Sequence, residues 1–272
     1  MTLRSATRRL LERRAPMAAR LFRTLREQAS ILRTAPKPAN EGFLLVAAGG
    51  VLHHGFEEQE RRIVRRELAN VDIFVDVGAN VGLYACLARA AGKKVIAIEP
   101  HGGNVQQLFR SLEANGWRDV EVWPLGAGSA TGTISLYGAG TGASTVSGWS
   151  GASEAFHQTI SITTLDILLA RRFEGERLFV KIDIEGGELP ALQGATTVLD
   201  RQPRPLWLVE ITLGEHRTDV NPHFAETFDA FFRRGYRCTT ADAEEREVTP
   251  VDVARWSAAG RVDFGSHNYL FR

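Results

Sequence analysis

The 272-residue sequence has little cysteine and no long apolar run. Its two cysteines, Cys86 and Cys238, are too few for a disulfide framework and lack the Cys-x-x-Cys spacing of a metal site. No segment reaches the roughly 18 uncharged apolar residues that a membrane-spanning helix needs, and no apolar stretch follows the basic N-terminus as in a signal peptide. These absences exclude a spanning protein and predict a cytoplasmic location.

Charge is distributed unevenly along the chain. Residues 1–33 contain nine Arg against Glu12 and Glu27, a net +7, so the rest of the chain carries −6 of the total +1. Leucines recur in this arm at helical spacing, and Pro16 is expected to separate two short helices. We expect residues 1–40 to form a basic amphipathic helical arm and linker that packs on a domain of residues 41–272. The alternative is attachment to an anionic membrane surface or to nucleic acid, of which we retain only the peripheral membrane contact.

Short apolar runs alternate with helical patterns beyond the linker, as in a doubly wound α/β sheet. Ligands of such sheets collect at the carboxyl ends of the strands. The pattern also predicts an inserted hairpin between the third and fourth units. The expected strands are 73–77, 94–98, 120–125, 178–184, 206–211, 236–240 and 268–272, the hairpin strands 133–137 and 160–163, and the helices near 82–91, 102–115, 164–172, 187–199 and 222–234.

The strongest local motif is DVGANVG at residues 76–82, between the first predicted strand and the following helix. Gly78 and Gly82 let the backbone approach a ligand closely, and the helix N-terminus offers free N–H groups to an anion. The motif differs from the GxGxxG of dinucleotide enzymes because an acid precedes the first glycine and Asn80 occupies the middle of the loop. A cationic amino group near Asp76 with a carboxylate near the loop fits better, which describes the methionine end of S-adenosylmethionine.

Acidic residues also close three further predicted strands. Glu99 ends the second strand, where an acid accepts hydrogen bonds from both ribose hydroxyls of a nucleoside cofactor. Period-two alternation places Lys181, Asp183 and Glu185 on one side of the fourth strand. Glu210 closes the fifth strand and is a candidate partner of Asp183 for a divalent cation, but no spacing here amounts to a metal motif, so we predict no metal.

The ordered set of motifs resembles the FkbM family of class I S-adenosylmethionine-dependent methyltransferases. The resemblance extends over about residues 43 to 271 and implies a Rossmann-like, mostly parallel seven-stranded sheet with an antiparallel last strand. It also implies S-adenosylmethionine as the cofactor. The matching motifs are GFE at 55–57, FVDVGANVG ending at 82, IEP at 98–100, TTLD at 163–166 and KIDIEGGE at 181–188.

The resemblance implies that residues of the loops at the strand ends contact the cofactor. Where the family usually has an Ala and then an Asp after the third strand, this sequence has Gly126 and Ser129. Backbone amides around Ala127 are therefore expected to recognise the adenine edge. The expected cofactor contacts are Asp76 at the methionine amino group, Gly78, Asn80 and Gly82 along the methionine and ribose, Glu99 at the ribose, and Pro100 and Ala127.

The resemblance further implies methyl transfer to a hydroxyl of a saccharide, either a glycan or a lipid-linked sugar. Asp183 and Glu185 are expected to orient or deprotonate that hydroxyl, with Lys181 keeping both acids ionised. Trp149, in a Gly- and Ser-rich loop, is a candidate to stack on the substrate beneath a lid. Alternatives are O-methylation of a polyketide or other small secondary metabolite, a nicotinamide-dependent oxidoreductase, and a non-catalytic cofactor-binding module.

Overall fold

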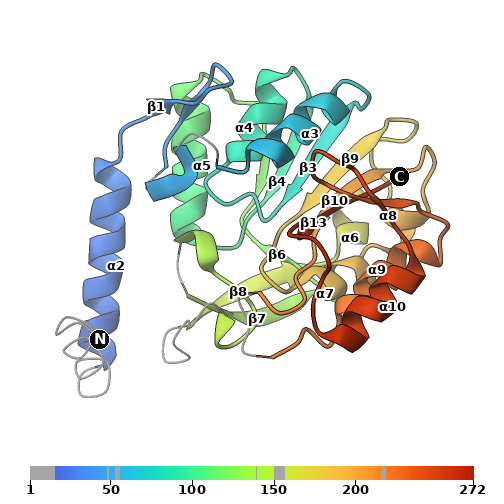
Figure 1. Cartoon of the computed structure of the whole chain (residues 1–272). Helices are drawn as coiled ribbons and strands as arrows, with labels where there is room; N and C mark the ends of the chain where they lie inside the picture. Colours follow the sequence, from blue (N-terminus) through green and yellow to red (C-terminus); the bar gives the residue numbers. More distant parts are fainter. Residues whose placement is uncertain (1–15, 48, 53–55, 139, 150–156, 216–218) are drawn as a thin grey trace.

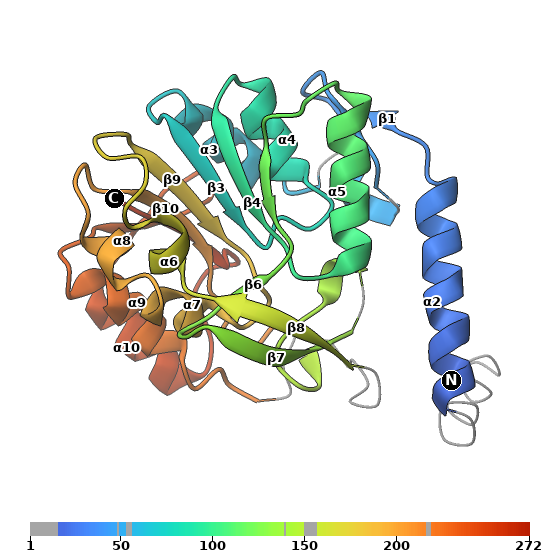
Figure 2. The same ribbon diagram turned by 180° about the vertical axis from the view of Figure 1, so that it is seen from behind.

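The computed structural model describes residues 16–47, 49–52, 56–138, 140–149, 157–215 and 219–272. The first 15 residues of the predicted arm and Gly55 of the GFE motif lie outside these ranges. Within the described part of the chain, helices cover both faces of a large central sheet (Figure 1). A smaller sheet lies beyond one end of it, beside the N-terminal end of α5 (Figure 2).

The central sheet contains eight strands in the order β12-β11-β13-β10-β9-β3-β4-β5 among the described residues. Neighbours from β10 to β5 run parallel, whereas β13 is antiparallel to both β10 and β11. The class I methyltransferase fold predicted from the sequence is confirmed, including the antiparallel last strand. The strands are β3 (Ile73–Val77), β4 (Lys94–Ile98), β5 (Glu121–Trp123), β9 (Leu178–Ile182), β10 (Leu206–Glu210), β11 (Cys238–Thr240), β12 (Glu247–Val248) and β13 (Asn268–Phe271).

Strand β12 is the one addition to the seven predicted strands. It is two residues long and pairs with the outer edge of β11. A two-residue strand has no room for hydrophobic alternation, so the pattern used for the other strands could not find it.

Alternate residues of the central strands belong to two separate cores. All five positions of β3 and of β9 are buried, as expected for parallel strands covered on both faces. Ile73, Val75 and Val77 pack with the helices on one side, whereas Phe74 packs with those on the other. The helices on the Val75 side are α6 (Leu165–Leu169), α7 (Glu188–Gln193), α8 (Thr196–Asp200), α9 (Phe224–Phe232) and α10 (Pro250–Ala259), and those on the Phe74 side are α3 (Glu58–Leu68), α4 (Leu83–Ala90) and α5 (Gly102–Ala114).

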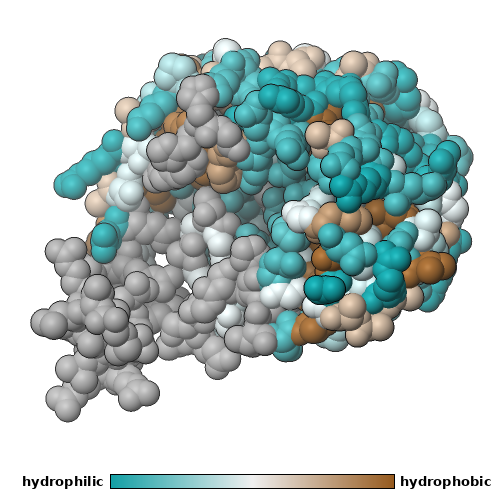
Figure 3. Space-filling view, viewed as in Figure 1, coloured by the Kyte–Doolittle hydropathy of each residue, from teal (hydrophilic) through white to brown (hydrophobic). Residues whose placement is uncertain are grey.

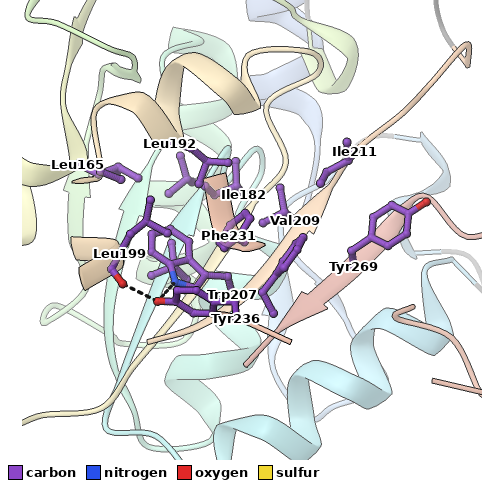
Figure 4. Close-up of a cluster of buried hydrophobic side chains, with 14 of the residues drawn as sticks. Leu165, Ile182, Leu192, Leu199, Trp207, Val209, Ile211, Phe231, Tyr236 and Tyr269 are labelled. Atoms are coloured by element: carbon purple, nitrogen blue, oxygen red, sulfur yellow. Dashed lines mark hydrogen bonds between the residues drawn. The ribbon is translucent and has the colours of Figure 1, made fainter. Parts of the chain in front are cut away.

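The larger core is built around aromatic side chains on the Val75 side (Figure 4). Trp207 donates from its indole N–H to the Tyr236 hydroxyl at 3.2 Å, and Tyr236 donates in turn to the Leu199 carbonyl at 2.8 Å. Both polar atoms of this buried pair are therefore satisfied. This aromatic core packs against the strands whose carboxyl ends form the site.

The predicted inserted hairpin is present as part of a three-stranded sheet. Strands β7 (Gly132–Tyr137) and β8 (His157–Thr163) pair antiparallel, and β6 (Gly126–Ala127) pairs parallel with β8. A short 3-10 helix, η2 (Gly140–Gly142), follows β7 and contacts α5. This arrangement places the hairpin beside the carboxyl end of β4, where it contributes to the wall of the central cavity.

The described part of the N-terminal arm is a single helix, α2 (Pro16–Arg33), which begins at the proline. A short hairpin of β1 (Lys37–Pro38) and β2 (Leu44–Leu45) follows, so the proposed boundary at residue 40 lies in its turn; η1 (Gly49–Leu52) comes next. The arm is predicted to pack on the domain with its helically spaced leucines; Ile31 is buried, but two of those leucines, Leu21 and Leu25, are exposed, so they do not form this contact.

Hydrophilic residues cover most of the described surface in the view of Figure 3. In the part of the chain that the structure describes, no helix is both long enough and apolar enough to cross a membrane.

Candidate active site

A cavity of about 590 Å³ lies at the carboxyl ends of β3, β4, β9 and β10. This volume is typical of a pocket for a small-molecule ligand. Two of the ten predicted site residues, Asp76 and Gly82, are not part of its lining. The eight that line it are Gly78, Asn80, Glu99, Pro100, Ala127, Lys181, Asp183 and Glu185.

Gly78 brings the loop after β3 against the end of β9. Its φ is +86°, and a Cβ atom there would lie 1.8 Å from the Asp183 carbonyl oxygen. The two segments are joined next to this point, because the Asp183 N–H donates to the Val77 carbonyl at 3.0 Å. The Gly78 N–H donates in turn to the Ile98 carbonyl at 2.9 Å, which ties the loop to β4. Only glycine fits here, and it brings the predicted cofactor loop next to the predicted catalytic residue.

Gly82 has a different reason for being glycine. It precedes α4 with a φ of +91°, and an added Cβ would lie 2.3 Å from Cδ1 of Leu108 on α5. The glycine therefore allows α5 to pack against the start of α4. Gly82 thus helps to position the loop of residues 78–82, although Gly82 itself does not line the cavity.

A hydrogen bond between Asn80 and Glu99 joins the loop after β3 to the segment after β4. Asn80 has a left-handed backbone, with φ +53°, and its N–H donates to Glu99 Oε2 at 2.8 Å. Glu99 Oε1 accepts from the His101 N–H at 2.8 Å and from Asn104 Nδ2 at 3.2 Å. Burial raises the pKa of Glu99, although these three hydrogen bonds lower it. Three of roughly four acceptor positions are thus filled, which leaves one on Oε2 for a ligand hydroxyl.

Asp76 is buried on the sheet face that α4 covers. It accepts a hydrogen bond from the Ala85 N–H in the first turn of α4, while its Oδ2 atom has no partner among the described residues. Its neighbour in register on β9 is Lys181. Burial raises the pKa of Asp76 to about 7, and the charge of Lys181 offsets only part of that effect. A cationic ligand group would stabilise the ionised form of Asp76 further.

Three buried oxygen atoms near this end of the cavity lack hydrogen-bond partners among the described residues: Asn80 Oδ1 and Asn104 Oδ1, on residues that line the cavity, and Asp76 Oδ2, behind the lining. All three are acceptors, so a ligand that brings donors would satisfy the two asparagines, and a cationic ligand group would stabilise the charge of Asp76. S-adenosylmethionine carries an ammonium group, ribose hydroxyls and an adenine amino group. The donor and acceptor chemistry of these residues therefore fits that cofactor.

The expected adenine end is apolar and tightly packed. An added Cβ at Gly126 would lie 3.2 Å from Ile162 and 3.3 Å from Ile160, so these isoleucines already fill the space that the family's usual alanine occupies. Ala127 lines the cavity, whereas Ser129 is exposed and does not. Ile160 and Ile162 on β8 thus lie close to Gly126, the position at which the family usually has alanine.

The buried Lys181 and the half-buried Asp183 form an ion pair at the other end of the cavity. Lys181 is 2% exposed, and its Nζ donates to Asp183 Oδ2 at 2.7 Å. Burial lowers the pKa of Lys181, but the carboxylates around it outweigh burial and keep the pKa above its ordinary value. Glu210, at the end of β10, forms a hydrogen bond with Asp183, and burial together with that acid raises the pKa of Glu210 well above its usual range. A hydrogen bond between two carboxyl groups requires a proton on one of them, and the raised pKa of Glu210 favours that residue as its holder.

Two further acids approach Lys181 from α3 and the residue before it. The Tyr84 hydroxyl donates to Glu57 Oε2 at 2.8 Å and lies 3.5 Å from Glu60 Oε2, and Lys181 Nζ lies 4.5 Å from the centre of the Tyr84 ring. Burial raises the pKa of Glu60 to about 8, an effect that Lys181 partly offsets and Glu57 increases. Burial likewise raises the pKa of Glu57. Lys181 is thus a cation in a predominantly acidic cavity.

Glu185 lies in a turn with a left-handed backbone. Side chains from the segment between β7 and β8 hold this turn in place. The φ of Glu185 is +57°, because β9 ends at Ile182 and the regular alternation stops there. Trp149 donates from its indole N–H to Glu185 Oε2 at 2.5 Å, and Ser144 donates to the Glu185 carbonyl at 2.5 Å. Trp149 is buried, so the prediction that it offers a stacking surface to the substrate is wrong. Its role in this structure is to position the turn.

Sequence reasoning did not identify Glu60, Tyr84 and Asn104 as site residues, and it quoted Glu57 only as part of the GFE motif. All four line the cavity. Tyr84 comes two residues after the DVGANVG loop, in the first turn of α4, which is the one local signal that points to it. Among the described residues, no group of three or more His, Cys, Asp or Glu side chains is arranged to hold a metal ion.

The sheet order, the glycine loop after β3 and the acid after β4 define the class I S-adenosylmethionine-dependent methyltransferases. A family model described as the methyltransferase FkbM domain matches residues 76–238, more than half of the chain. The chain belongs to the FkbM methyltransferase family. It is an S-adenosylmethionine-dependent methyltransferase.

The chain is also similar to individual known proteins. The hexuronic acid methyltransferase AglP of Haloferax volcanii is 30% identical over 172 residues, which cover 62% of this chain and 68% of the relative. Among solved structures, cofactor-bound Rv0187 from MTB has 11% identity and a TM-score of 0.45, covering 91% of this chain and 87% of that one. A precorrin-6y C5,15-methyltransferase from Geobacter metallireducens has 13% identity and a TM-score of 0.41, covering 84% and 92%.

Proposed function

We propose that this enzyme transfers a methyl group to a hydroxyl of a saccharide. The observation that carries the proposal is the setting of Asp183, a half-buried carboxylate at the end of β9 that lies against the cofactor loop. Lys181 and Glu210 hold this carboxylate from within the protein, and the cavity continues beside it. Such a group suits an acceptor whose proton must be removed.

S-adenosylmethionine supplies an electrophilic methyl group when it is bound. A sugar hydroxyl is a weak nucleophile, and its proton must leave as the new C–O bond forms. We assign Asp183 as the base that accepts this proton on a carboxylate oxygen. Lys181 fixes its orientation through the 2.7 Å hydrogen bond and keeps it ionised before the reaction. Asp76, Asn80 and the remaining acceptor position of Glu99 are proposed to hold the cofactor.

The charges in the cavity favour a hydroxyl acceptor over a carboxylate acceptor. Glu57, Glu60, Glu185 and Glu210 all line the same space, and the one lysine in the lining is already paired with Asp183. A carboxylate brought here would place a second negative charge beside Asp183 or compete with Asp183 for that lysine, whereas sugar hydroxyls can donate to the acids. The saccharide class is supported by the relative named as a hexuronic acid methyltransferase.

The proposal is tested by offering the enzyme label in the cofactor methyl group together with two acceptor fractions. One fraction contains polysaccharides and lipid-linked glycans, and the other contains small secondary metabolites. We expect label in the glycan fraction, recovered after acid hydrolysis in an O-methylated monosaccharide by mass spectrometry. Label that enters only the small-metabolite fraction, or that is absent from the released monosaccharides, would contradict the saccharide assignment.

A further inference from the structure

The contacts of helix α2 with the domain that its described side chains show lie near its C-terminal end. Ile31 is its buried residue among those described, and Arg110 on α5 donates to the carbonyls of Ile31 and of Thr34, the latter at 2.9 Å. Both ribbon views show α2 lying along α5 and its N-terminal half extending past the start of α5, at the end of the molecule that holds β7 and β8 (Figures 1 and 2). The N-terminal half of α2 therefore lies toward the same end of the sheet as the candidate active site.

A leucine stripe runs along the exposed side of this helix, formed by Leu21, Leu25 and Leu32. These side chains are 61%, 59% and 72% exposed. At about 100° of rotation per residue, the three fall within about 40° of one another on the helix surface. The three leucines thus present apolar side chains to solvent on one side of the helix, with Gln28 between Leu25 and Leu32, and this side lies beside the face on which Ile31 packs. Ordinary surface leucines are scattered singly, so an aligned row of three points to a partner.

The charge of the arm identifies the partner as anionic. Residues 1–33 carry +7, and Arg26 and Arg33 on α2 are exposed. These two arginines lie about 120° to 140° around the helix from Leu21, at the flank of the leucine stripe. The rest of the chain carries −6, so a negatively charged surface would attract the arm and repel the domain.

We propose that α2 binds peripherally to an anionic lipid bilayer, with the leucine stripe inserted at the headgroup boundary and the arginines at the lipid phosphates. A helix with an apolar stripe and a basic face is the usual form of an interfacial membrane anchor. A second copy of the chain is less suited to this helix, because two arms would bring two +7 segments together. The proposal is independent of the acceptor and of the chemistry at Asp183.

The test uses the full chain and vesicles of two compositions, phosphatidylcholine alone and phosphatidylcholine with one quarter phosphatidylglycerol, in a co-sedimentation assay. We expect binding to the anionic vesicles only, with at least a tenfold loss of affinity between 50 mM and 300 mM NaCl. The variant L21S/L25S/L32S should lose on the order of 100-fold in binding, because three inserted leucines are removed.

The matched control is I167S/V251S, which removes two exposed apolar side chains on α6 and α10, 67% and 74% exposed. This variant should bind vesicles as the unchanged protein does. All variants should retain affinity for adenosylhomocysteine, which shows that the domain is folded. Absence of binding to anionic vesicles, or equal binding of the leucine variant, would overturn the proposal. Light scattering that finds a dimer dependent on the same leucines, without vesicle binding, would assign the stripe to self-association instead.

Discussion

Replacing Lys181 by Met should destabilise the protein more strongly at high pH than at low pH. Lys181 is 2% exposed, donates to Asp183 at 2.7 Å and lies beside Asp76 in the strand register. Met fills a similar volume but leaves these buried acids without their cation. Breaking a buried ion pair in this way costs about 3 to 5 kcal/mol, so we expect a loss of that size at pH 7.5.

The pH dependence follows from the direction in which the acid pKa values move. Without Lys181, burial raises the pKa of the acids further above their unfolded values, so the folded variant binds more protons than the unfolded chain. Its stability therefore falls as pH rises between those values, by about 1.4 kcal/mol per pH unit for each acid concerned. The unchanged protein already loses part of this stability over the same range, because the pKa of its Asp76 is about 7. For one such acid, the loss relative to the unchanged protein should therefore be about 1 kcal/mol smaller at pH 5.5 than at pH 7.5.

The assay is chemical denaturation at the two pH values, with Lys94→Met as the control. Lys94 pairs with Glu176 at the surface, and exposed pairs of this kind contribute about 0 to 1 kcal/mol at either pH. A loss below about 1 kcal/mol for Lys181→Met at pH 7.5, or a loss that is larger at pH 5.5, would refute the reasoning that Lys181 compensates the buried acids.

Four other outcomes follow from the site. Asp183→Asn should lower kcat at least 100-fold while adenosylhomocysteine affinity stays within threefold by calorimetry; an equal loss of both would move Asp183 to the cofactor side. Glu99→Gln should weaken the same ligand by about 1 to 3 kcal/mol, and unchanged affinity would reject the ribose assignment. Because the pKa of Asp76 is about 7 and a ligand ammonium favours its ionised form, affinity should fall about tenfold from pH 8 to pH 6, and a flat profile would exclude this pairing. Gly78→Ala should cost several kcal/mol in thermal denaturation because its Cβ meets backbone at 1.8 Å, whereas Gly92→Ala, with φ +78° and open space, should cost only about 1 kcal/mol; equal effects would contradict the close approach.

The sheet and the cofactor loop could be predicted because their signals are local. Strands such as 73–77 are continuous apolar runs, and the loop that follows places its glycines directly in the sequence. The acid at the end of a strand is equally visible, since parallel strands present their carboxyl ends at one edge. The positions of Gly78, Glu99 and Asp183 around one cavity follow from these rules alone.

The remaining part of the site depends on contacts between distant segments. Glu57 and Glu60 precede β3, the first strand of the central sheet along the chain, and their approach to Lys181 depends on how α3 packs beside α4. The spacing of acidic residues along a helix does not predict which of them the fold will bury. The burial of Trp149 is another such case, because its partner Glu185 is 36 residues away in the chain. The exposed leucines of α2 likewise follow from where the helix docks, which its own periodicity does not determine.

The chemical form of the transferred methyl group tests the proposed reaction most directly. Saccharide product made with a labelled methyl donor is treated with mild aqueous base and its label is then counted. A methyl ether on a sugar hydroxyl resists base, whereas a methyl ester of a uronic acid is hydrolysed to methanol. The acid-lined cavity around Asp183 predicts that the label stays on the sugar. Release of the label as methanol would contradict methyl transfer to a hydroxyl.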